Sequence, residues 1–239
     1  MLVGSLSLAL SQPQAAVQRI QGITEPVRDA ILNSPVDGII ARQFFDEGSF
    51  AREGEVLLEL DKSLQELEAA RRQIVRDNRK KEYDRLSALY QETKSVSEED
   101  LDKKRLEYQE AQAEFELAAE LVRKRQIVAP FSGFVVDWFN RDPGEGCKQN
   151  ETALVRLVDT RQARFICNLE ADRGSLVRLK QKVRLELGEP ANRQLVDGEV
   201  IFVSPIVDAA SGLLTVKILF QNPDGTVRPG VSGFLLLPE

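Results

Sequence analysis

Few side chains in this sequence have the types and spacing that catalysis needs. Glu145 with Glu151, and Glu170 with Asp172, are pairs of carboxylates close enough in sequence to suggest acid–base chemistry. Nothing near either pair supplies a nucleophile or a metal partner, and the 239 residues include no histidine, the commonest general base and metal ligand. We therefore interpret both pairs as surface charges, and predict a protein without catalytic residues, bound cofactor or metal.

The two cysteines, Cys147 and Cys167, are too few for a framework of disulfides. Their separation is also unlike the ligand spacing of a zinc site. A disulfide would need their Cα atoms to approach within roughly 7 Å. The sequence leaves open whether the two cysteines pair or remain free thiols.

Lys62 lies in the stretch LELDKS, which resembles the Asp-Lys turn that carries lipoate or biotin in carrier domains. A lysine modified in this way must sit on an exposed tight turn. Here a helical pattern begins at once, which places Lys62 in the first turn of a helix. We therefore predict an ordinary solvated lysine, and keep a lipoyl-type or biotinyl-type carrier domain of an enzyme complex as an alternative function.

The elements that must position these residues include a long helical segment, residues 62–128, interrupted by a polar break near Thr93 to Ser97. Heptad-like spacing predicts two antiparallel arms that meet along an apolar seam. Ser97 followed by Asp100 resembles a helix cap and marks the start of the second arm. The predicted seam residues are Leu64, Leu67, Ile74, Tyr83, Leu86 and Leu89 on the first arm, and Leu101, Tyr108, Ala111, Phe115, Ala118 and Val122 on the second.

Charge supports this antiparallel pairing. The stretch from Arg71 to Lys81 is strongly basic, and folding the segment about residue 95 places it opposite Glu110, Glu114 and Glu116. We interpret the basic stretch as half of a charge-matched hairpin. With a net charge of −6, the sequence predicts no nucleic-acid partner.

On either side of the helical segment the sequence is rich in β signals. Residues 34–61 and 129–159 repeat one pattern about 95 residues apart, with Pro35 and Gly38 matched by Pro130 and Gly133. Each half is too small to bury a core alone, so we predict that they form one β-sandwich. Aromatic residues of both halves are assigned to its core: Phe44, Phe45, Phe50, Phe131, Phe134, Trp138 and Phe139.

The remaining segments are predicted as follows. Residues 20–33 form a strand entering from the barrel side, at a sheet edge because of Pro26. Residues 160–239 form a small antiparallel β-barrel, with one helical turn within residues 170–179. Residues 1–19 are a signal-like or flexible N-terminus, in which the apolar run from Leu2 to Leu10 precedes Ala15 and Ala16.

The order of these segments resembles the periplasmic adaptor, or membrane fusion, proteins of bacterial efflux and type I secretion systems (HlyD-like, with RND-type efflux adaptor subunits). The resemblance covers about residues 20–239. It is carried by SPVDGII through LLELD, by APFSGFV through LVRLVD, by the inserted hairpin, and above all by GEVIFVSPIVDAASGLLTVKILFQNPDGTVRPGVSG. It implies a mixed α and β, elongated fold: a split lipoyl-like β-sandwich with an inserted antiparallel coiled-coil hairpin, followed by a small antiparallel β-barrel.

The resemblance also implies a function. Such a protein works in the periplasm, associates with itself into a ring, and joins an inner-membrane transporter, of the RND or ABC type, to an outer-membrane channel protein. A coiled-coil interaction module with no role in transport is a further alternative.

The family's tip motif, which contacts the exit duct, is matched by Arg85 and Leu89, with Ser97 as the third member. The spacing to Ser97 is one residue longer than in the family, so a helix cap is an equal interpretation of Ser97. The barrel turn from Arg178 to Val183 lacks the glycine that the family often shows. The sequence stops at Glu239 after the last barrel strand, so the membrane-proximal domain of many members is expected to be missing or very small.

Overall fold

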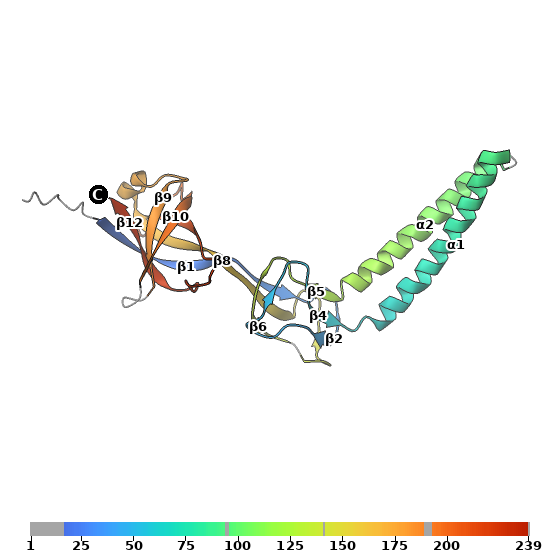
Figure 1. The fold of residues 1–239 in the computed structure, drawn as a ribbon, viewed down its shortest axis with the longest axis horizontal. Helices are drawn as coiled ribbons and strands as arrows, with labels where there is room; N and C mark the ends of the chain where they lie inside the picture. Colours follow the sequence, from blue (N-terminus) through green and yellow to red (C-terminus); the bar gives the residue numbers. More distant parts are fainter. Residues whose placement is uncertain (1–16, 94–95, 141, 189–192, 239) are drawn as a thin grey trace, which may run out of the picture. The chain divides into compact units, whose positions relative to one another are not determined.

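The computed structural model describes residues 17–93, 96–140, 142–188 and 193–238 (Figure 1). The predicted signal-like run and the two alanines after it lie outside these residues. The chain divides into two compact units, residues 1–28 with 159–239, and residues 29–158. Two long strands contribute to both units: β1 (Val17–Asn33) and β8 (Ala153–Glu170).

The first unit contains a β-barrel. Its strands pair in the order β1, β12, β9, β10, β11 and β8, and a further pairing between β8 and β1 closes it. Alternate residues point inward, and Phe165, Leu185, Ile218 and Leu235 are among the fully buried side chains of its core. The bounds are β9 (Lys182–Leu187), β10 (Gln194–Val203), β11 (Leu213–Gln221) and β12 (Ser232–Pro238), with a 3₁₀ turn, η1 (Ala171–Leu176), after β8.

Closure of the barrel corrects the expectation that β1 is an edge strand, because β1 pairs on both sides. Pro26 is tolerated because the pairing of β1 with β12 ends at Ile23, so β12 needs no N–H from residue 26. Gly22 makes the approach of β1 to β8 possible. A Cβ atom at Gly22 would lie 2.3 Å from the carbonyl oxygen of Ile166.

The turn from Arg178 to Val183 has a shape that usually calls for glycine. Lys180 adopts a φ of 66°, in the left-handed region, and its N–H donates to the carbonyl of Val200 at 2.8 Å. The turn therefore keeps a left-handed residue although its sequence has no glycine.

The second unit contains the two repeated stretches. One sheet is formed in the order β5 (Gln126–Val128), β4 (Val56–Leu60), β2 (Gly38–Gln43) and β7 (Gly146–Cys147), while β3 (Phe50–Ala51) and β6 (Gly133–Trp138) join β8. The repeat is visible in the strand pairing. Gly38 of β2 pairs with Cys147 of β7, and Gly133 of β6 pairs with Ala51 of β3. Each stretch thus supplies a partner strand to the other, and the two share one hydrophobic core.

The aromatic residues of these stretches do not all belong to that core. Phe131 is buried, and Phe45 and Trp138 pack against the core. The assignment is wrong for the other four, Phe44, Phe50, Phe134 and Phe139, which are exposed. The reason is strand alternation: Phe50 and Phe134 face each other across β3 and β6 on the outer side, with ring centroids 5.2 Å apart.

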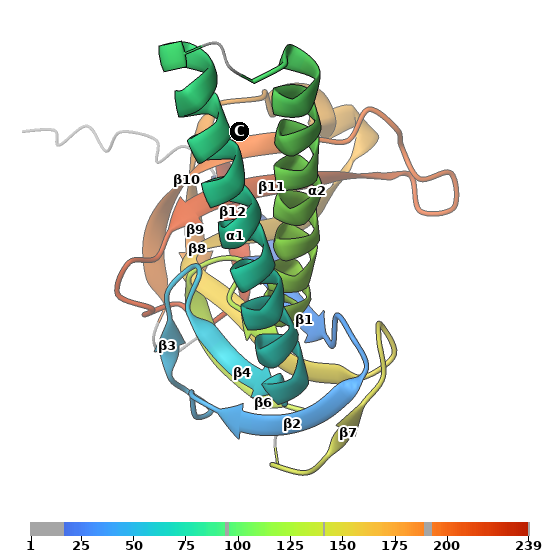
Figure 2. The same cartoon turned by 90° about the vertical axis from the view of Figure 1, so that its right-hand side faces the viewer.

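Helices α1 (Ser63–Thr93) and α2 (Glu98–Arg123) lie side by side (Figure 2). Ion pairs show that they are antiparallel: Arg72–Glu114, Arg79–Glu107 at 3.0 Å and Lys104–Glu82 at 3.3 Å are all centred on residue 93. Glu114 is one of the three predicted acidic partners. The other two ion pairs were not predicted.

The predicted seam is right for α2 and wrong for the first half of α1 and for Leu89, which is 40% exposed. Ala111 and Ala118 of α2 are buried, whereas Leu64, Leu67 and Ile74 of α1 are 76%, 69% and 63% exposed. At this level of α1 the seam is formed by arginine side chains, whose stems cover apolar surface. The Arg76 guanidinium lies 4.4 Å from the centre of the Phe115 ring, and Arg72 bonds to Glu114.

Candidate functional site

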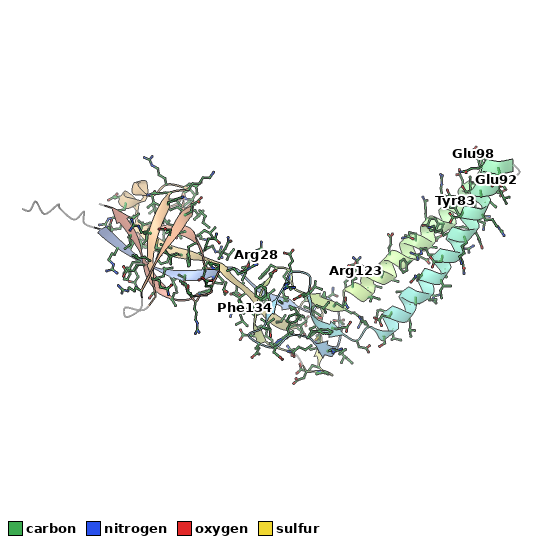
Figure 3. All side chains as sticks on the ribbon, in the orientation of Figure 1. Arg28, Tyr83, Glu92, Glu98, Arg123 and Phe134 are labelled. Carbon is green, nitrogen blue, oxygen red and sulfur yellow. The ribbon has the colours of Figure 1, made fainter. Side chains whose placement is uncertain are left out.

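The end of the helical pair distant from the sheets is the site that the sequence singles out. Tyr83 of α1 stacks on Tyr108 of α2, with ring centroids 6.2 Å apart and 10° between the ring planes. This contact holds the two helices together about three turns below the end of α1. Figure 3 shows Tyr83 near this end, with Glu92 and Glu98 beside the turn.

Arg85 and Leu89 lie on α1 between this stack and the turn. They are four residues apart, so they share one face of the helix, and both are exposed. A cation and an aliphatic group are therefore presented together near the tip. Their contact with another protein stays a prediction.

Ser97 is the N-cap of α2, as the sequence predicts. Its backbone is extended, with φ −74° and ψ 151°, and its Oγ accepts from the Asp100 N–H at 3.1 Å. The Ser97 hydroxyl also donates to Asp100 Oδ2 at 2.6 Å. Ser97 therefore has a structural role independent of any partner, and acidic residues in the first turn complement the helix dipole.

Lys62 lies between β4 and α1, immediately before the helix rather than in its first turn. Its amine pairs with Glu59 and, at 3.2 Å, with Glu66. The hydrogen bond to Glu59 contributes most to raising the pKa of Lys62, so its charged form is favoured. This ion-paired lysine beside a long helix differs from the exposed tight turn that a carrier lysine requires.

The two cysteines are free thiols, buried in different hydrophobic cores. Burial raises the pKa of Cys167 to about 12. Burial, and secondarily Glu145, raises the pKa of Cys147. Neither thiol favours the thiolate form that nucleophilic chemistry uses.

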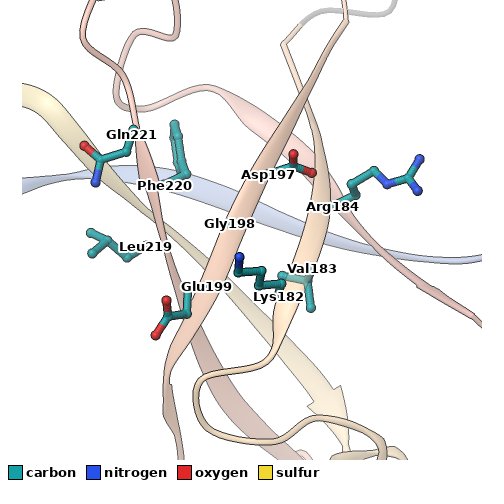
Figure 4. Close-up of a pocket in the computed structure, with 9 residues that line it drawn as sticks. All are labelled: Lys182, Val183, Arg184, Asp197, Gly198, Glu199, Leu219, Phe220 and Gln221. Atoms are coloured by element: carbon teal, nitrogen blue, oxygen red, sulfur yellow. The ribbon is translucent and has the colours of Figure 1, made fainter.

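Among the described residues, no group of three or more histidine, cysteine, aspartate or glutamate residues is placed to hold a metal ion. A groove of about 470 Å³ crosses β9, β10 and β11 (Figure 4). Lys182, Arg184, Asp197 and Glu199 line it, and this even mixture of charges selects no single class of ligand. In the part of the chain that the structure describes, no helix is long and apolar enough to span a membrane.

No family model matches the chain. The toluene efflux pump periplasmic linker protein TtgA of Pseudomonas putida is 26% identical over 238 residues, which cover 92% of this chain and 61% of the relative. The multidrug resistance protein MdtE of Escherichia coli is 25% identical and covers 93% of this chain and 64% of the relative. The chain thus spans about three fifths of the length of these relatives.

Solved structures share the fold. A chimera of MacA and MexA, containing the α-hairpin domain of Pseudomonas aeruginosa MexA, has a TM-score of 0.76 at 18% identity, over 93% of this chain and 83% of the other. A putative efflux transporter from Bacteroides eggerthii has a TM-score of 0.73 at 20% identity, over 98% of this chain and 73% of the other. The resemblance to the periplasmic adaptor, or membrane fusion, proteins that the sequence predicts is therefore confirmed in sequence and in fold.

Proposed function

We propose that this protein is a periplasmic adaptor subunit that links an inner-membrane transporter to an outer-membrane channel in an efflux system. The observation that carries the proposal is similarity to periplasmic linker proteins of efflux pumps over about nine tenths of the chain. The transporter is of the RND or ABC type, and the protein associates with itself into a ring.

The arrangement of elements supports a mechanical role. We interpret the β-structure of residues 34–61 and 129–159 as a split lipoyl-like sandwich, and α1 with α2 as a coiled-coil hairpin inserted into it. The hairpin projects its tip, with Arg85 and Leu89, as the surface that meets the channel. We propose that residues 160–239 form the barrel domain that faces the transporter, and that residues 20–33 are a strand that enters from the barrel side.

A role as adaptor is favoured over a role as enzyme or carrier. The buried thiols have raised pKa values, and Lys62 is held in ion pairs beside α1. A coiled-coil module unrelated to transport is disfavoured because the similarity to linker proteins extends beyond the helices into both β units.

Photo-crosslinking in cells tests the proposal. A photoreactive amino acid replaces Leu89 near the tip, the end of α1 at the turn to α2. As a control, it replaces Gln73 on the polar side of α1, nearer the root, the end of α1 that follows β4. The proposal expects an outer-membrane channel protein, identified by mass spectrometry, to be captured from position 89 and not from position 73. Capture of no channel protein from position 89, or equal capture from both positions, would contradict it.

A further inference from the structure

A groove of about 620 Å³ lies beside the end of α2 in the second unit. Its lining includes Leu32 of β1 and Ile127 of β5, which pack in the hydrophobic core of this unit. It also includes Ile31 and Val128, which are 54% and 46% exposed. The volume is within the range of sites that hold small organic molecules, about 300–1,000 Å³, and the aliphatic lining favours the apolar part of such a ligand.

The internal repeat explains why the groove exists. Residues 31–33 of β1 stand before Pro35 as residues 126–128 of β5 stand before Pro130. The two segments are therefore equivalent strands of the two repeated stretches, and both line the groove, as do the two prolines. The groove lies where the two stretches bring equivalent strands together.

Among the described residues, each of these segments has a strand partner on one side. The end strand β5 pairs with β4, while β1 pairs with β12 as far as Ile23 and also with β8. Equivalent hydrogen bonds follow the two segments: the Ser34 N–H donates to the Thr152 carbonyl at 3.0 Å, and the Ala129 N–H donates to the Glu55 carbonyl at 2.9 Å. In the sheets that the structure describes, no strand lies between the two segments, so the groove stays open.

The two segments are too short to hold an added strand. Each is three residues long, and Pro35 or Pro130 follows two residues after its end. Proline has no N–H to donate to a neighbouring strand. A peptide in the groove would therefore make few of the backbone hydrogen bonds that give strand addition its affinity. A compact small molecule fits the groove better than a peptide does.

Charge indicates the polar part of the ligand. Lys124, the C-cap of α2, lines the groove, is exposed, and makes no ion pair with another described residue. Arg123 also lines the groove and pairs with Glu120, the acidic residue of the lining. The Asn33 amide donates to the Asn150 carbonyl through a long hydrogen bond of 3.4 Å. One positive charge remains without a partner, so the lining complements a carboxylate, sulfonate or phosphate group.

We infer that this groove binds an amphipathic organic anion, whose apolar body lies against Leu32 and Ile127 while its acidic group meets Lys124. The site goes beyond the proposed function, which requires protein partners alone. A ligand there contacts the end of α2 and both repeated stretches at once, so its binding stabilises the junction of α2 with β5.

Two dyes that differ in one group test the inference on the full chain. Anilinonaphthalene sulfonate is an amphipathic anion, and phenylnaphthylamine has the same rings without the sulfonate. Fluorescence titration measures the dissociation constant of each dye. We expect saturable binding of the anionic dye at one site per chain, and roughly tenfold weaker binding of the neutral dye. Equal affinity for the two dyes would overturn the assignment of an anionic ligand.

Substitutions assign the dye to the groove. Lys124→Glu reverses the charge of its lining, and Lys103→Glu makes the same change about 30 Å away along α2. Val128→Asn removes an aliphatic group from the lining, and Val136→Asn does so on β6, where Val136 is 42% exposed. We expect Lys124→Glu to weaken binding of the anionic dye roughly tenfold, Val128→Asn to weaken binding of both dyes roughly threefold or more, and the two control variants to match the parent chain.

Several results would overturn the inference, once circular dichroism has verified that each variant folds. These are no saturable binding of the anionic dye to the parent chain, or equal binding to the parent chain and all four variants, which would place the dye elsewhere. Sedimentation experiments add one more. If Val128→Asn weakens self-association and leaves dye binding unchanged, a second copy of the chain covers the groove instead of a small molecule.

Protection of an introduced thiol locates the ligand directly. Val128→Cys is alkylated with a maleimide with and without the anionic dye, and Val136→Cys is the matched control. Cys147 and Cys167 are buried, so the parent chain provides the background. With dye at ten times its dissociation constant, we expect alkylation at position 128 to slow roughly tenfold and alkylation at position 136 to keep its rate. An unchanged rate at position 128 would contradict the inference. Capture of a channel protein from position 89 is measured independently, so this inference and the proposed function fail separately.

Discussion

Asp29 and Arg156 form a two-pronged ion pair between β1 and β8. Arg156 Nε donates to Asp29 Oδ1 at 2.9 Å, and a terminal nitrogen of Arg156 donates to Oδ2 at 2.6 Å. The hydrogen bonds from Arg156 lower the pKa of Asp29, although partial burial opposes this shift. The pair joins residues 127 positions apart, so it ties the strand that leads into the first repeated stretch to the end of the second stretch.

This pair predicts a pH dependence of stability. A carboxyl group whose pKa is lowered in the folded state stabilises that state at pH values above its unfolded pKa of about 3.9, and this contribution is lost as the pH falls through the lowered value. The pair is partly exposed, so its contribution is about 1 kcal/mol or less. We expect Asp29→Asn to lower the free energy of unfolding at pH 7 and to have progressively less effect toward pH 3. Denaturant titrations at several pH values measure this, and a difference independent of pH would contradict it.

Closure of the barrel predicts a strong effect of one methyl group. Gly22→Ala would place its Cβ 2.3 Å from the Ile166 carbonyl oxygen and close to the Phe165 ring, so the backbone must shift. We expect a loss of about 3 kcal/mol or more in the free energy of unfolding. Gly146→Ala is the matched control, since a Cβ there meets no atom within 4 Å, and it should change stability by about 0.5 kcal/mol or less. Similar unfolding curves for both variants would show that β1 and β8 do not approach at Gly22.

The cap at Ser97 predicts different outcomes for two substitutions. Ser97→Ala removes the acceptor for the Asp100 N–H and should cost about 1 kcal/mol of helix stability. Ser97→Asp supplies another good N-cap, so it should keep the helix and, if capping is the role of Ser97, also keep channel binding. Circular dichroism at increasing temperature and a binding assay separate the two effects. Loss of channel binding by Ser97→Asp with intact helices would assign Ser97 to the contact instead.

The repeat and the second helix were predictable because their signals are local. Pro35, Gly38, Pro130 and Gly133 recur at one spacing, and the exchanged pairing of β2 with β7 and of β3 with β6 follows that repeat. In α2, small and aromatic residues alternate along one face, and Ala111 is buried against α1. Only close approach of a second helix requires residues of such small size on that face.

The first half of α1 was not predictable in the same way. Periodicity shows that Leu67 and Ile74 share a helix face, but it does not show which partner that face meets. Arg72 and Arg76 take the seam because their stems pack over α2 while their charges reach Glu114 and the Phe115 ring. Arginine is counted as polar in a hydrophobic pattern, so the sequence pattern assigned the seam to the wrong face.

The assignment of Phe50 to the core was wrong for a related reason. Strands as short as β3 carry too few residues to show an alternation. Phe50 therefore resembled a core residue in sequence, although its pairing with Phe134 places it on the outer side. Which face of a two-residue strand points inward is decided by its partner strand, which lies far away in the sequence.

The tip of the hairpin provides the most direct test of the adaptor function. Arg85→Asp reverses an exposed charge near the tip, and Lys80→Asp makes the same change on the polar side of α1, closer to the root. Channel binding and export are measured in cells for both variants, after circular dichroism has verified that each chain folds. We expect Arg85→Asp to reduce both channel binding and export roughly tenfold or more, and Lys80→Asp to leave both near the level of the parent chain. Unchanged channel binding and unchanged export in a folded Arg85→Asp chain would contradict the adaptor function.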